Sequence, residues 1–387
     1  MEYIKLKEIA TFPTGKLNSN AAVEDGKYPF FTCSHDIYRI DSFSYDGEYV
    51  LLGGNNASGD FPIFYYQGKF DAYQRTYMIR PKRPKEFLTK YLFYGISLRL
   101  LQMKGNAAGT ATKFLTQPIL QNIYIEKRNI QNQEKIVSIL SVYDNLIEAN
   151  NKRIKLLEQM AENLYKEWFV RFRFPGHETV EFENGLPKGW EYSTIESLSN
   201  ILQRGISPEY DDEGDLTVIS QKCIRQTIMD IREARKQTKQ YRDELNLQDG
   251  DTVICSTGTG TLGRVGQVYG DYPKTTFDSH VTLVRAKQDA GKHYLFWTLK
   301  NMEAWFMNMG IGSTNQQELY RNTIKNAKAI KPKKEIVELF ERTIEPIHND
   351  IVFLIHSQEN LTKQRDLLLP RLMSGKLEAS MEETKNG

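Results

Sequence analysis

Apolar side chains recur at a seven-residue period in two separate stretches of the chain, residues 131–174 and 332–377. In each stretch two rows of such positions run three or four residues apart, which over several heptads predicts a long helix in a coiled coil. Asn150 falls on one row, where a polar residue would help to fix the register. The predicted seam residues are Leu140, Ile147, Ile154, Leu157 and Leu164 in the first stretch, and Ile344, Ile351, Leu354, Leu361 and Leu368 in the second.

Two prolines, Pro346 and Pro370, interrupt the second stretch. A proline inside a helix removes one backbone N–H and clashes with the preceding turn. We therefore expect a kink or break near Glu345 and another near Leu369.

Residues 1–130 and 187–331 have a different pattern, in which glycine, aspartate and proline separate short apolar runs. This punctuation predicts strands and loops. Helical spacing predicts one helix in each part, at about 89–103 and at about 294–307.

The order globular, helical, globular, helical indicates an internal duplication. Sliding the chain over itself by about 203 residues places TKYLFYGIS over KHYLFWTLK and QNQEKIVSIL near KPKKEIVELF. The predicted fold class is α+β. Two globular α/β domains (1–130 and 187–331) alternate with two long helices that pack as an antiparallel coiled coil, in a pseudo-two-fold repeat. A run of unrelated domains is the alternative.

Composition excludes a disordered or collagen-like chain, because 40% of the 387 residues are apolar and 26% are charged. The formal net charge is only +2, so no chain-wide basic field indicates nucleic acid. Residues 1–128 contain 17 Lys and Arg against 12 Asp and Glu, whereas residues 190–331 contain 18 of each. Only the first globular part carries a net positive charge that would favour binding a polyanion. A partner would therefore have to supply many of the positive charges that bind phosphates.

Three widely spaced cysteines fit reduced thiols and not a disulfide frame. The first residues have no secretion signal, and no uncharged apolar run approaches the ~18–20 residues that span a bilayer. We therefore expect a cytoplasmic protein.

The chain shows no catalytic constellation. Residues 258–263 match G-x-G-x-x-G, but RVGQVYGDYP follows, which is strand and turn and not a helix. A glycine-rich hairpin loop is the better interpretation. There is no P-loop and no Asn/Asp-Pro-Pro-aromatic motif of a base methylase, and the six histidines never pair at metal-ligand spacing. His348 and His356 are expected to be ordinary polar-face residues of the second long helix.

The long helical stretches resemble a known family. The run EKIVSILSVYDNLIEANNKRIKLLEQMAENLYKEWFVRF, followed by LPKGWEYSTIESL, is similar to the central spacer of specificity subunits of type I restriction–modification enzymes. The tail LTKQRDLLLPRLMSGKLE resembles their C-terminal repeat, and the two globular parts resemble their paired target-recognition domains.

The resemblance implies a non-catalytic subunit in which each recognition domain reads one half of a split DNA target. The helices would set the spacing and dock two methylation subunits. S-adenosylmethionine, ATP and Mg are then expected on the methylation and restriction subunits and not on this chain. A coiled-coil scaffold without a DNA role and a self-contained methylating nuclease are the rival hypotheses.

Polar loops at matching places in the two globular parts predict the DNA contacts, since amides can read adenine, arginine can read guanine, and hydroxyls and ammonium groups suit phosphates. Ordinary solvated loops are the alternative interpretation. The predicted DNA-binding residues are Asn55, Asn56, Gln74, Arg75, Lys104, Asn106, Thr110, Thr112, Lys113, Ser256, Thr257, Thr259, Arg264, His280, Thr314, Asn315 and Gln316.

Overall fold

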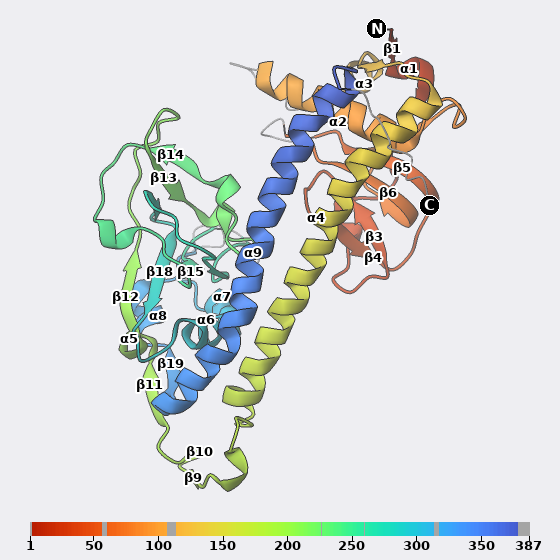
Figure 1. Cartoon of the computed structure of the whole chain (residues 1–387). Coiled ribbons are helices and arrows are strands. Elements are labelled where there is room, and N and C mark those ends of the chain that lie inside the picture. The colour runs from red at the N-terminus through yellow and green to blue at the C-terminus, as the bar shows by residue number, and fades with distance from the viewer. Residues whose placement is uncertain are drawn as a thin grey trace, which may run out of the picture. The chain divides into compact units, whose positions relative to one another are not determined.

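The computed structural model describes residues 2–55, 60–106, 114–225, 227–258, 260–312 and 317–377. The chain divides into two compact units (Figure 1). Unit 1 consists of residues 1–149 and 358–387, and unit 2 consists of residues 150–357. The helices α4 (Ile130–Tyr165) and α9 (Lys334–Met373) each contribute to both units.

Unit 1 is built on a six-stranded sheet with the order β2-β7-β5-β6-β3-β4. All neighbouring strands are antiparallel except β3 and β6, which are parallel. The strands are β2 (Ala10–Thr11), β3 (Tyr28–Phe31), β4 (Tyr38–Ile40), β5 (Tyr45–Gly53), β6 (Ile63–Ala72) and β7 (Thr76–Pro81). The helix α2 (Thr89–Asn106) packs on β5, β6 and β7, and starts where the sequence predicts a helix.

Both ends of the chain contribute to unit 1. Strand β1 (Tyr3–Lys5) pairs with β8 (Tyr124–Glu126), and the short helices α1 (Leu6–Ile9) and α3 (Gln117–Gln121) lie beside each other. The core joins Leu92 and Ile96 of α2 to Leu140 of α4 and to Leu369 and Leu372 of α9. The C-terminal helix is therefore part of this core.

Unit 2 contains an antiparallel sheet with the order β12-β18-β15-β16 and a smaller sheet with the order β14-β13-β17. The strands are β12 (Ser199–Arg204), β13 (Leu216–Ile219), β14 (Arg235–Gln237), β15 (Thr252–Cys255), β16 (Val265–Gln267), β17 (Thr275–Phe277) and β18 (Val281–Ala286). Two further pairs are antiparallel: β9 (Phe182–Glu183) with β10 (Leu186–Pro187), and β11 (Glu191–Thr194) with β19 (Lys328–Lys331).

Aromatic packing holds the helices of unit 2 together. The ring centroid of Tyr294 in α6 (Lys292–Asn301) lies 4.6 Å from that of Phe169. Phe169 belongs to the π-helical turn Lys166–Val170 that follows α4. Phe340 of α9 lies 4.8 Å from Phe169. The helix predicted at 294–307 is in fact two helices, because α6 ends before Met302 and α7 (Glu303–Asn308) follows. Glu303 accepts a hydrogen bond from the Val265 amide, which ties the start of α7 to β16. The helices α5 (Ile195–Leu198) and α8 (Arg321–Lys325) complete the unit.

Helix α9 continues through Pro346 and Pro370, so of the predicted kink or break at each proline the break does not occur. Each proline costs about 3 kcal/mol in a helix interior. Burial offsets this cost, because Ile344 and Ile347 beside the first proline and Leu369 and Leu372 beside the second are at most 8% exposed.

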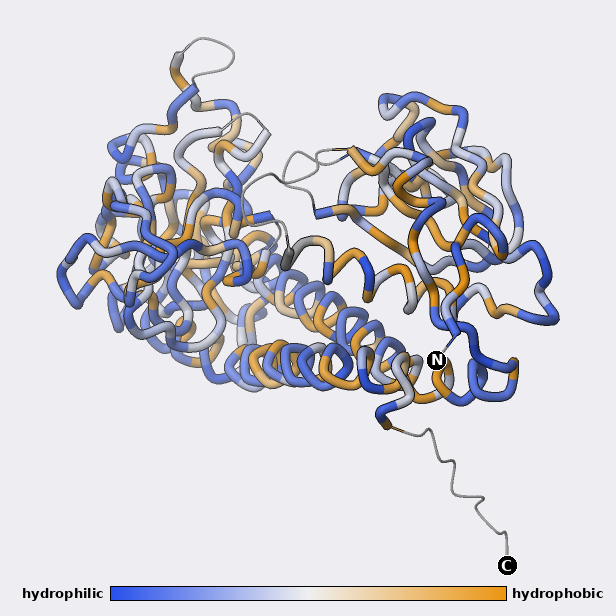
Figure 2. The backbone as a smooth tube through the Cα atoms, turned by 90° about the horizontal axis from the view of Figure 1, so that it is seen from above, coloured by the Kyte–Doolittle hydropathy of each residue, from blue (hydrophilic) through white to orange (hydrophobic). Residues whose placement is uncertain are grey.

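Within each unit α4 and α9 run antiparallel. In unit 1 Asp144 pairs with Arg365 at 3.1 Å, and the Ile147 carbonyl accepts from Gln358 at 3.4 Å. In unit 2 the Asn150 amide donates to Ser357 at 3.3 Å, and Tyr165 lies 6.4 Å from Phe340. All ten predicted seam residues are buried or half-buried. Figure 2 shows hydrophobic and hydrophilic residues alternating along both helices.

Candidate nucleic-acid interface

Three loop segments of unit 2 lie together. One follows β15, one precedes β18, and one contains Glu318 and Leu319. The Ser256 amide donates to the His280 carbonyl at 2.8 Å, and the Leu319 amide donates to the Ser256 carbonyl at 2.8 Å. Thr257 and Glu318 form an antiparallel bridge. These backbone bonds bring Thr257 beside His280, and the threonine hydroxyl lies 2.6 Å from Nδ1 of the imidazole. Two predicted DNA-binding residues are therefore neighbours, 23 positions apart in sequence.

Asp278 supports this pair. Its carboxylate accepts the His280 amide at 2.9 Å, which shapes the turn before β18. Burial raises the pKa of Asp278, whereas the hydrogen bond from His280 and the charge of Arg204 act in the opposite direction. The turn thus places the exposed His280 next to the buried carboxylate of Asp278.

Unit 1 contains an equivalent set of backbone bonds. The Gly54 amide donates to the Arg75 carbonyl at 2.8 Å, and the Leu115 amide donates to the Gly54 carbonyl at 2.9 Å. Asn55 and Phe114 form an antiparallel bridge, as Thr257 and Glu318 do in unit 2. Asn55 and Arg75 therefore occupy the places that Thr257 and His280 occupy in unit 2, so one backbone frame carries two different pairs of polar side chains.

The remaining predicted residues of unit 1 are placed as follows. Gln74 is exposed and its amide donates to Asn18 at 3.1 Å, and Arg75 next to it is also exposed. Lys104 and Asn106 lie in the last turn of α2. Asn56, Thr110, Thr112 and Lys113 lie outside the described residues.

In unit 2 the structure corrects one prediction. Ser256 is fully buried and its hydroxyl lies 2.7 Å from the Thr282 hydroxyl, so this side chain supports the loop and does not face a ligand. Arg264 is half-buried, directly before β16. Thr259, Thr314, Asn315 and Gln316 lie outside the described residues.

Arg204 is a polar residue of this region that the sequence did not indicate. It donates through Nε to the Ser279 carbonyl and through Nη1 to the Glu318 carboxylate. Those partners are 75 and 114 positions away in sequence, so no local pattern connects them.

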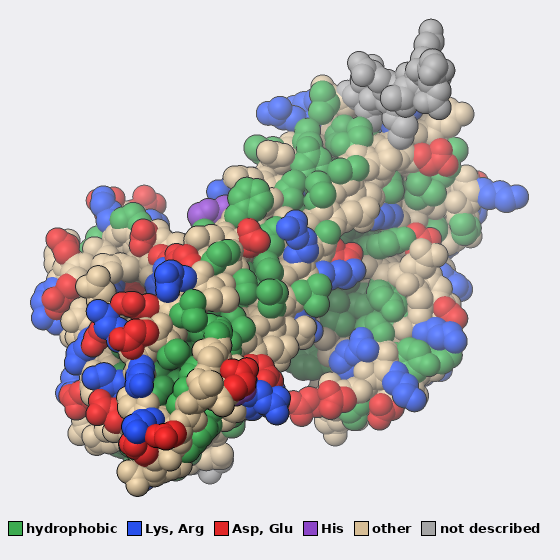
Figure 3. All heavy atoms as spheres, turned by 60° about the horizontal axis from the view of Figure 1, so that its bottom comes forward, with side chains coloured by type: hydrophobic (Ala, Val, Ile, Leu, Met, Phe, Trp, Pro, Cys, Tyr) green, Lys and Arg blue, Asp and Glu red, His purple; other side chains and the backbone are tan. Residues whose placement is uncertain are grey.

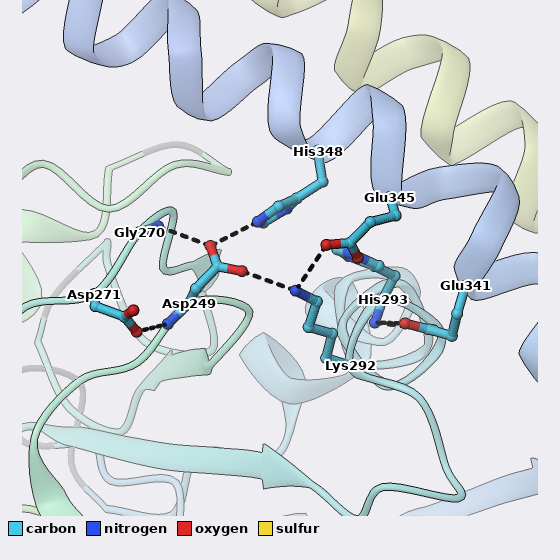
Figure 4. A network of polar contacts seen from close by, with 8 residues as sticks. All are labelled: Asp249, Gly270, Asp271, Lys292, His293, Glu341, Glu345 and His348. Carbon is cyan, nitrogen blue, oxygen red and sulfur yellow. Dashed lines mark hydrogen bonds and ion pairs between the residues drawn. The ribbon is translucent and has the colours of Figure 1, made fainter.

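A second polar cluster in unit 2 joins α9 to the globular part of the unit, which contains Asp249, Lys292 and His293 (Figure 4). Nε2 of His348 donates to one carboxylate oxygen of Asp249 at 2.7 Å, and Lys292 donates to the other oxygen at 2.8 Å. Glu345 lies 3.0 Å from Nε2 of His293. We call Asp249, Lys292, His293, Glu345 and His348 the anchor cluster. His348 is only 2% exposed, so the expectation that it is a polar-face residue is wrong.

Burial and hydrogen bonds shift the pKa values of the anchor cluster. Burial alone would raise the pKa of Asp249, but the hydrogen bonds from His348 and Lys292 outweigh it and hold that pKa below its usual value. The hydrogen bond with His293 lowers the pKa of Glu345 to about 2. Burial lowers the pKa of His348. The cluster therefore holds its carboxylates ionised and favours a neutral His348.

Neither a metal-ion site nor a membrane-spanning helix occurs among the described residues. Among these residues no group of three or more His, Cys, Asp or Glu side chains is arranged to hold a metal ion. No helix within the described ranges is long and apolar enough to cross a membrane. Lys, Arg, Asp and Glu side chains are interspersed on the face seen in Figure 3, in keeping with the small net charge.

Comparison with known proteins identifies the family. The family model described as type I restriction modification DNA specificity domain matches residues 1–159 and again residues 187–352. The chain is 28% identical over 228 residues to the type I restriction enzyme EcoDI specificity subunit of Escherichia coli, a match that covers 53% of this chain and about half (50%) of that relative. It is 22% identical over 404 residues to the MjaVIII specificity subunit of Methanocaldococcus jannaschii, covering 97% of this chain and 91% of the relative.

A solved structure shows the same fold. The crystal structure of the type I restriction–modification S subunit from M. genitalium superimposes with a TM-score of 0.53 at 15% identity, covering 96% of this chain and 95% of the other. Together with the twofold match of the family model, this means that the chain belongs to the family of DNA specificity subunits of type I restriction–modification enzymes, which are non-catalytic components of those enzymes.

Proposed function

We propose that this chain recognises a bipartite DNA target, with one half read by unit 1 and the other half by unit 2. The observation that carries the proposal is the repeated loop frame: the same backbone bonds hold Asn55 and Arg75 in unit 1 and Thr257 and His280 in unit 2. A shared set of backbone bonds that carries different polar side chains suits two domains that recognise different DNA sequences. The family model also matches each half of the chain separately, which supports the internal repeat.

The side chains suit direct readout of base edges. Asn55 can bond adenine and Arg75 can bond guanine in the major groove. Thr257 and His280 can donate to or accept from base edges, and can donate to phosphates. Because the chain carries a net charge of only +2, much of the phosphate neutralisation would come from partner subunits.

The two long helices are proposed to form an antiparallel coiled coil that sets the distance between the half-sites. The buried Asn150, bonded to Ser357, would fix the register of the two helices. The antiparallel pairing seen within each unit and the repeated heads support a pseudo-two-fold arrangement.

Partner subunits would carry the chemistry. Helix α4 exposes Val142 and Leu146 in unit 1 and Leu156 and Met160 in unit 2, each at least 46% exposed. Exposed apolar side chains at helical spacing suit the docking of partner helices. We propose that two methylation subunits dock on the spacer helices, and that S-adenosylmethionine binds to them while ATP and Mg bind to restriction subunits.

The test is to assemble the chain with the methylation subunits of its own system and to select bound duplexes from a randomised DNA pool. Two short conserved half-sites separated by a constant unread gap are expected, and methylation mapping should report the same motif. Failure of every assembly to retard any duplex would favour the scaffold alternative. Methyl transfer by the isolated chain would contradict a non-catalytic role.

A further inference from the structure

The guanidinium of Arg204 bridges two segments of unit 2, one at Ser279 and one at Glu318. Nε donates to the Ser279 carbonyl, and Nη1 donates to the Glu318 carboxylate. The side chains of Arg204 and Glu318 are 28% and 33% exposed, so the pair is partly shielded from solvent. A forked guanidinium with two fixed acceptors holds both partners in a defined geometry.

The two partners flank the side chains proposed to face DNA. The Ser279 carbonyl belongs to the peptide that leads directly into His280, and Glu318 is paired through its backbone with Thr257. Arg204 thus closes a ring in which Thr257 and His280 are also in contact with each other at 2.6 Å. Removing the guanidinium would open this ring, although the backbone bond between Ser256 and His280 would remain.

Unit 1 has the same backbone positions with different side chains. Thr14 pairs with Tyr77 across the sheet as Arg204 pairs with Thr282. Each position directly precedes a glycine, Gly15 or Gly205, whose missing Cβ would meet backbone carbonyl oxygens at 2.0–2.5 Å.

The place of Glu318 is taken in unit 1 by Phe114. No guanidinium–carboxylate bridge can form between Thr14 and Phe114. The Tyr77 hydroxyl instead donates to the Leu115 carbonyl at 3.1 Å. The two units therefore fasten equivalent loops by different chemistry.

We propose that Arg204 and Glu318 are positioning residues that determine how strictly unit 2 reads its half-site, because their bridge holds Thr257 and His280 as one rigid recognition edge. This inference rests on the proposed function. It predicts that loosening the bridge relaxes base preference at the second half-site and leaves the first half-site unchanged.

The experiment uses the full chain assembled with its methylation subunits and compares Arg204→Met, Arg204→Lys and Glu318→Gln with the parent by selection from a randomised DNA pool. In Arg204→Met we expect discrimination at the second half-site to fall about tenfold. Arg204→Lys retains the charge but cannot bond both acceptors through one planar fork, so it should recover only part of the loss. Discrimination at the first half-site reports that each complex is assembled and bound to DNA.

The exchange of Arg204→Glu together with Glu318→Arg separates the bridge from a simple ion pair. It restores opposite charges, but a carboxylate at position 204 cannot donate to the Ser279 carbonyl. We expect the second half-site to remain relaxed in this double variant.

Arg242→Met is the matched control, because Arg242 bonds Gln203, the neighbour of Arg204 in β12, at 2.8 Å, outside the ring. Its half-site preferences should equal those of the parent. If the parent reads two half-sites and Arg204→Met and Arg204→Lys leave the second unchanged, or weaken both equally, the positioning role is wrong while the proposed function stands. If the parent complex reads no half-site, the proposed function fails and this inference fails with it.

Discussion

At the residue scale, the proposed function assigns base recognition to single polar side chains, and Arg75 is the side chain most open to test. It is exposed and follows Gln74, whose amide is already bonded to Asn18. Replacing Arg75 with alanine should relax one position of the first half-site, at a cost of about 1–3 kcal/mol in binding the preferred duplex. Binding of duplexes altered at that position, measured by fluorescence anisotropy, checks this.

Arg83 provides the matched control for Arg75. It is an exposed arginine of the same unit that pairs with Glu86, outside the loop frame. Arg83→Ala should shift affinity for all duplexes alike or not at all. Equal losses of base preference in both variants would contradict a specific role for Arg75.

The recognition residues also show how far sequence reasoning reaches at this scale. The sequence singled out Thr257 and His280, because each matches a position in the first half of the chain, but it did not predict that the two side chains are in contact. The burial of Ser256 was not predictable, because its partner Thr282 is 26 positions away and only the sheet register brings the two hydroxyls together. Arg204 carried no signal for the same reason.

At the element scale, α4 is stabilised mainly by its buried face. Two residues close together in sequence, one on the buried face and one on the exposed face, allow the two contributions to stability to be compared. Ile154 is 6% exposed in the core of unit 2, whereas Leu156 is 64% exposed. Ile154→Ala should lower the free energy of unfolding by about 2–5 kcal/mol. Leu156→Ala should change it by less than about 0.5 kcal/mol. Urea denaturation of both variants gives the comparison, and equal losses would show that the seam is misplaced.

The anchor cluster predicts a pH dependence in two windows. Because burial lowers the pKa of His348 below 6.5, the unfolded state binds a proton there that the folded state resists, so stability is lost as the pH falls below about 6.5. The groups facing His348 are Asp249, Tyr269, Lys292 and His293, with Glu345 on its own helix. Glu345, with its pKa lowered from 4.5 to about 2, adds a second loss as the pH falls from about 4.5 toward 2.

Thermal denaturation from pH 8 to pH 2 measures both windows. His348→Gln should flatten the Tm profile between pH 7 and 5 and should shrink the acid window only in part, because it removes one hydrogen bond to Asp249 but keeps Glu345, whereas Glu345→Gln should reduce mainly the acid window. His356→Gln is the control, because His356 lies on the same helix outside the cluster. A His348→Gln profile identical to that of the parent would exclude the buried histidine as the titrating group.

The helices themselves were the most predictable elements. Heptad periodicity is a local signal, and it located α4 and α9 to within a few residues at their N-terminal ends. It could not show that α9 continues through Pro346 and Pro370, because the compensating burial comes from residues far away in sequence. The division of α6 from α7 likewise depends on a bond between Glu303 and a distant strand.

At the scale of the whole molecule, the spacer should act as a ruler. Inserting four residues near Ala149 lengthens α4 by about 6 Å at ~1.5 Å per residue, and DNA rises ~3.4 Å per base pair. A four-residue insertion is a stutter that locally unwinds a coiled coil without reversing its seam. Both half-sites should keep their sequences while the gap between them grows by one or two base pairs, as methylation mapping would show.

An active insertion variant with an unchanged gap would contradict the ruler. Exchange of residues 1–130 for the first head of another family member is the companion control, since it should alter one half-site and leave the gap and the other half-site unchanged.

The composition of unit 1 has a consequence for the order in which the protein forms during synthesis. Leu369 and Leu372 belong to the same core as Leu140, so this core is incomplete until the last helix leaves the ribosome. At about 5–20 residues per second, synthesis of the intervening residues 150–357 takes roughly 10–40 s. Unit 1 therefore begins before unit 2 along the chain but is completed after it. A nascent chain released before residue 358 would contain every residue of unit 2 but would leave the apolar face of Ile136 and Leu140 uncovered, a ready target for chaperones and proteases.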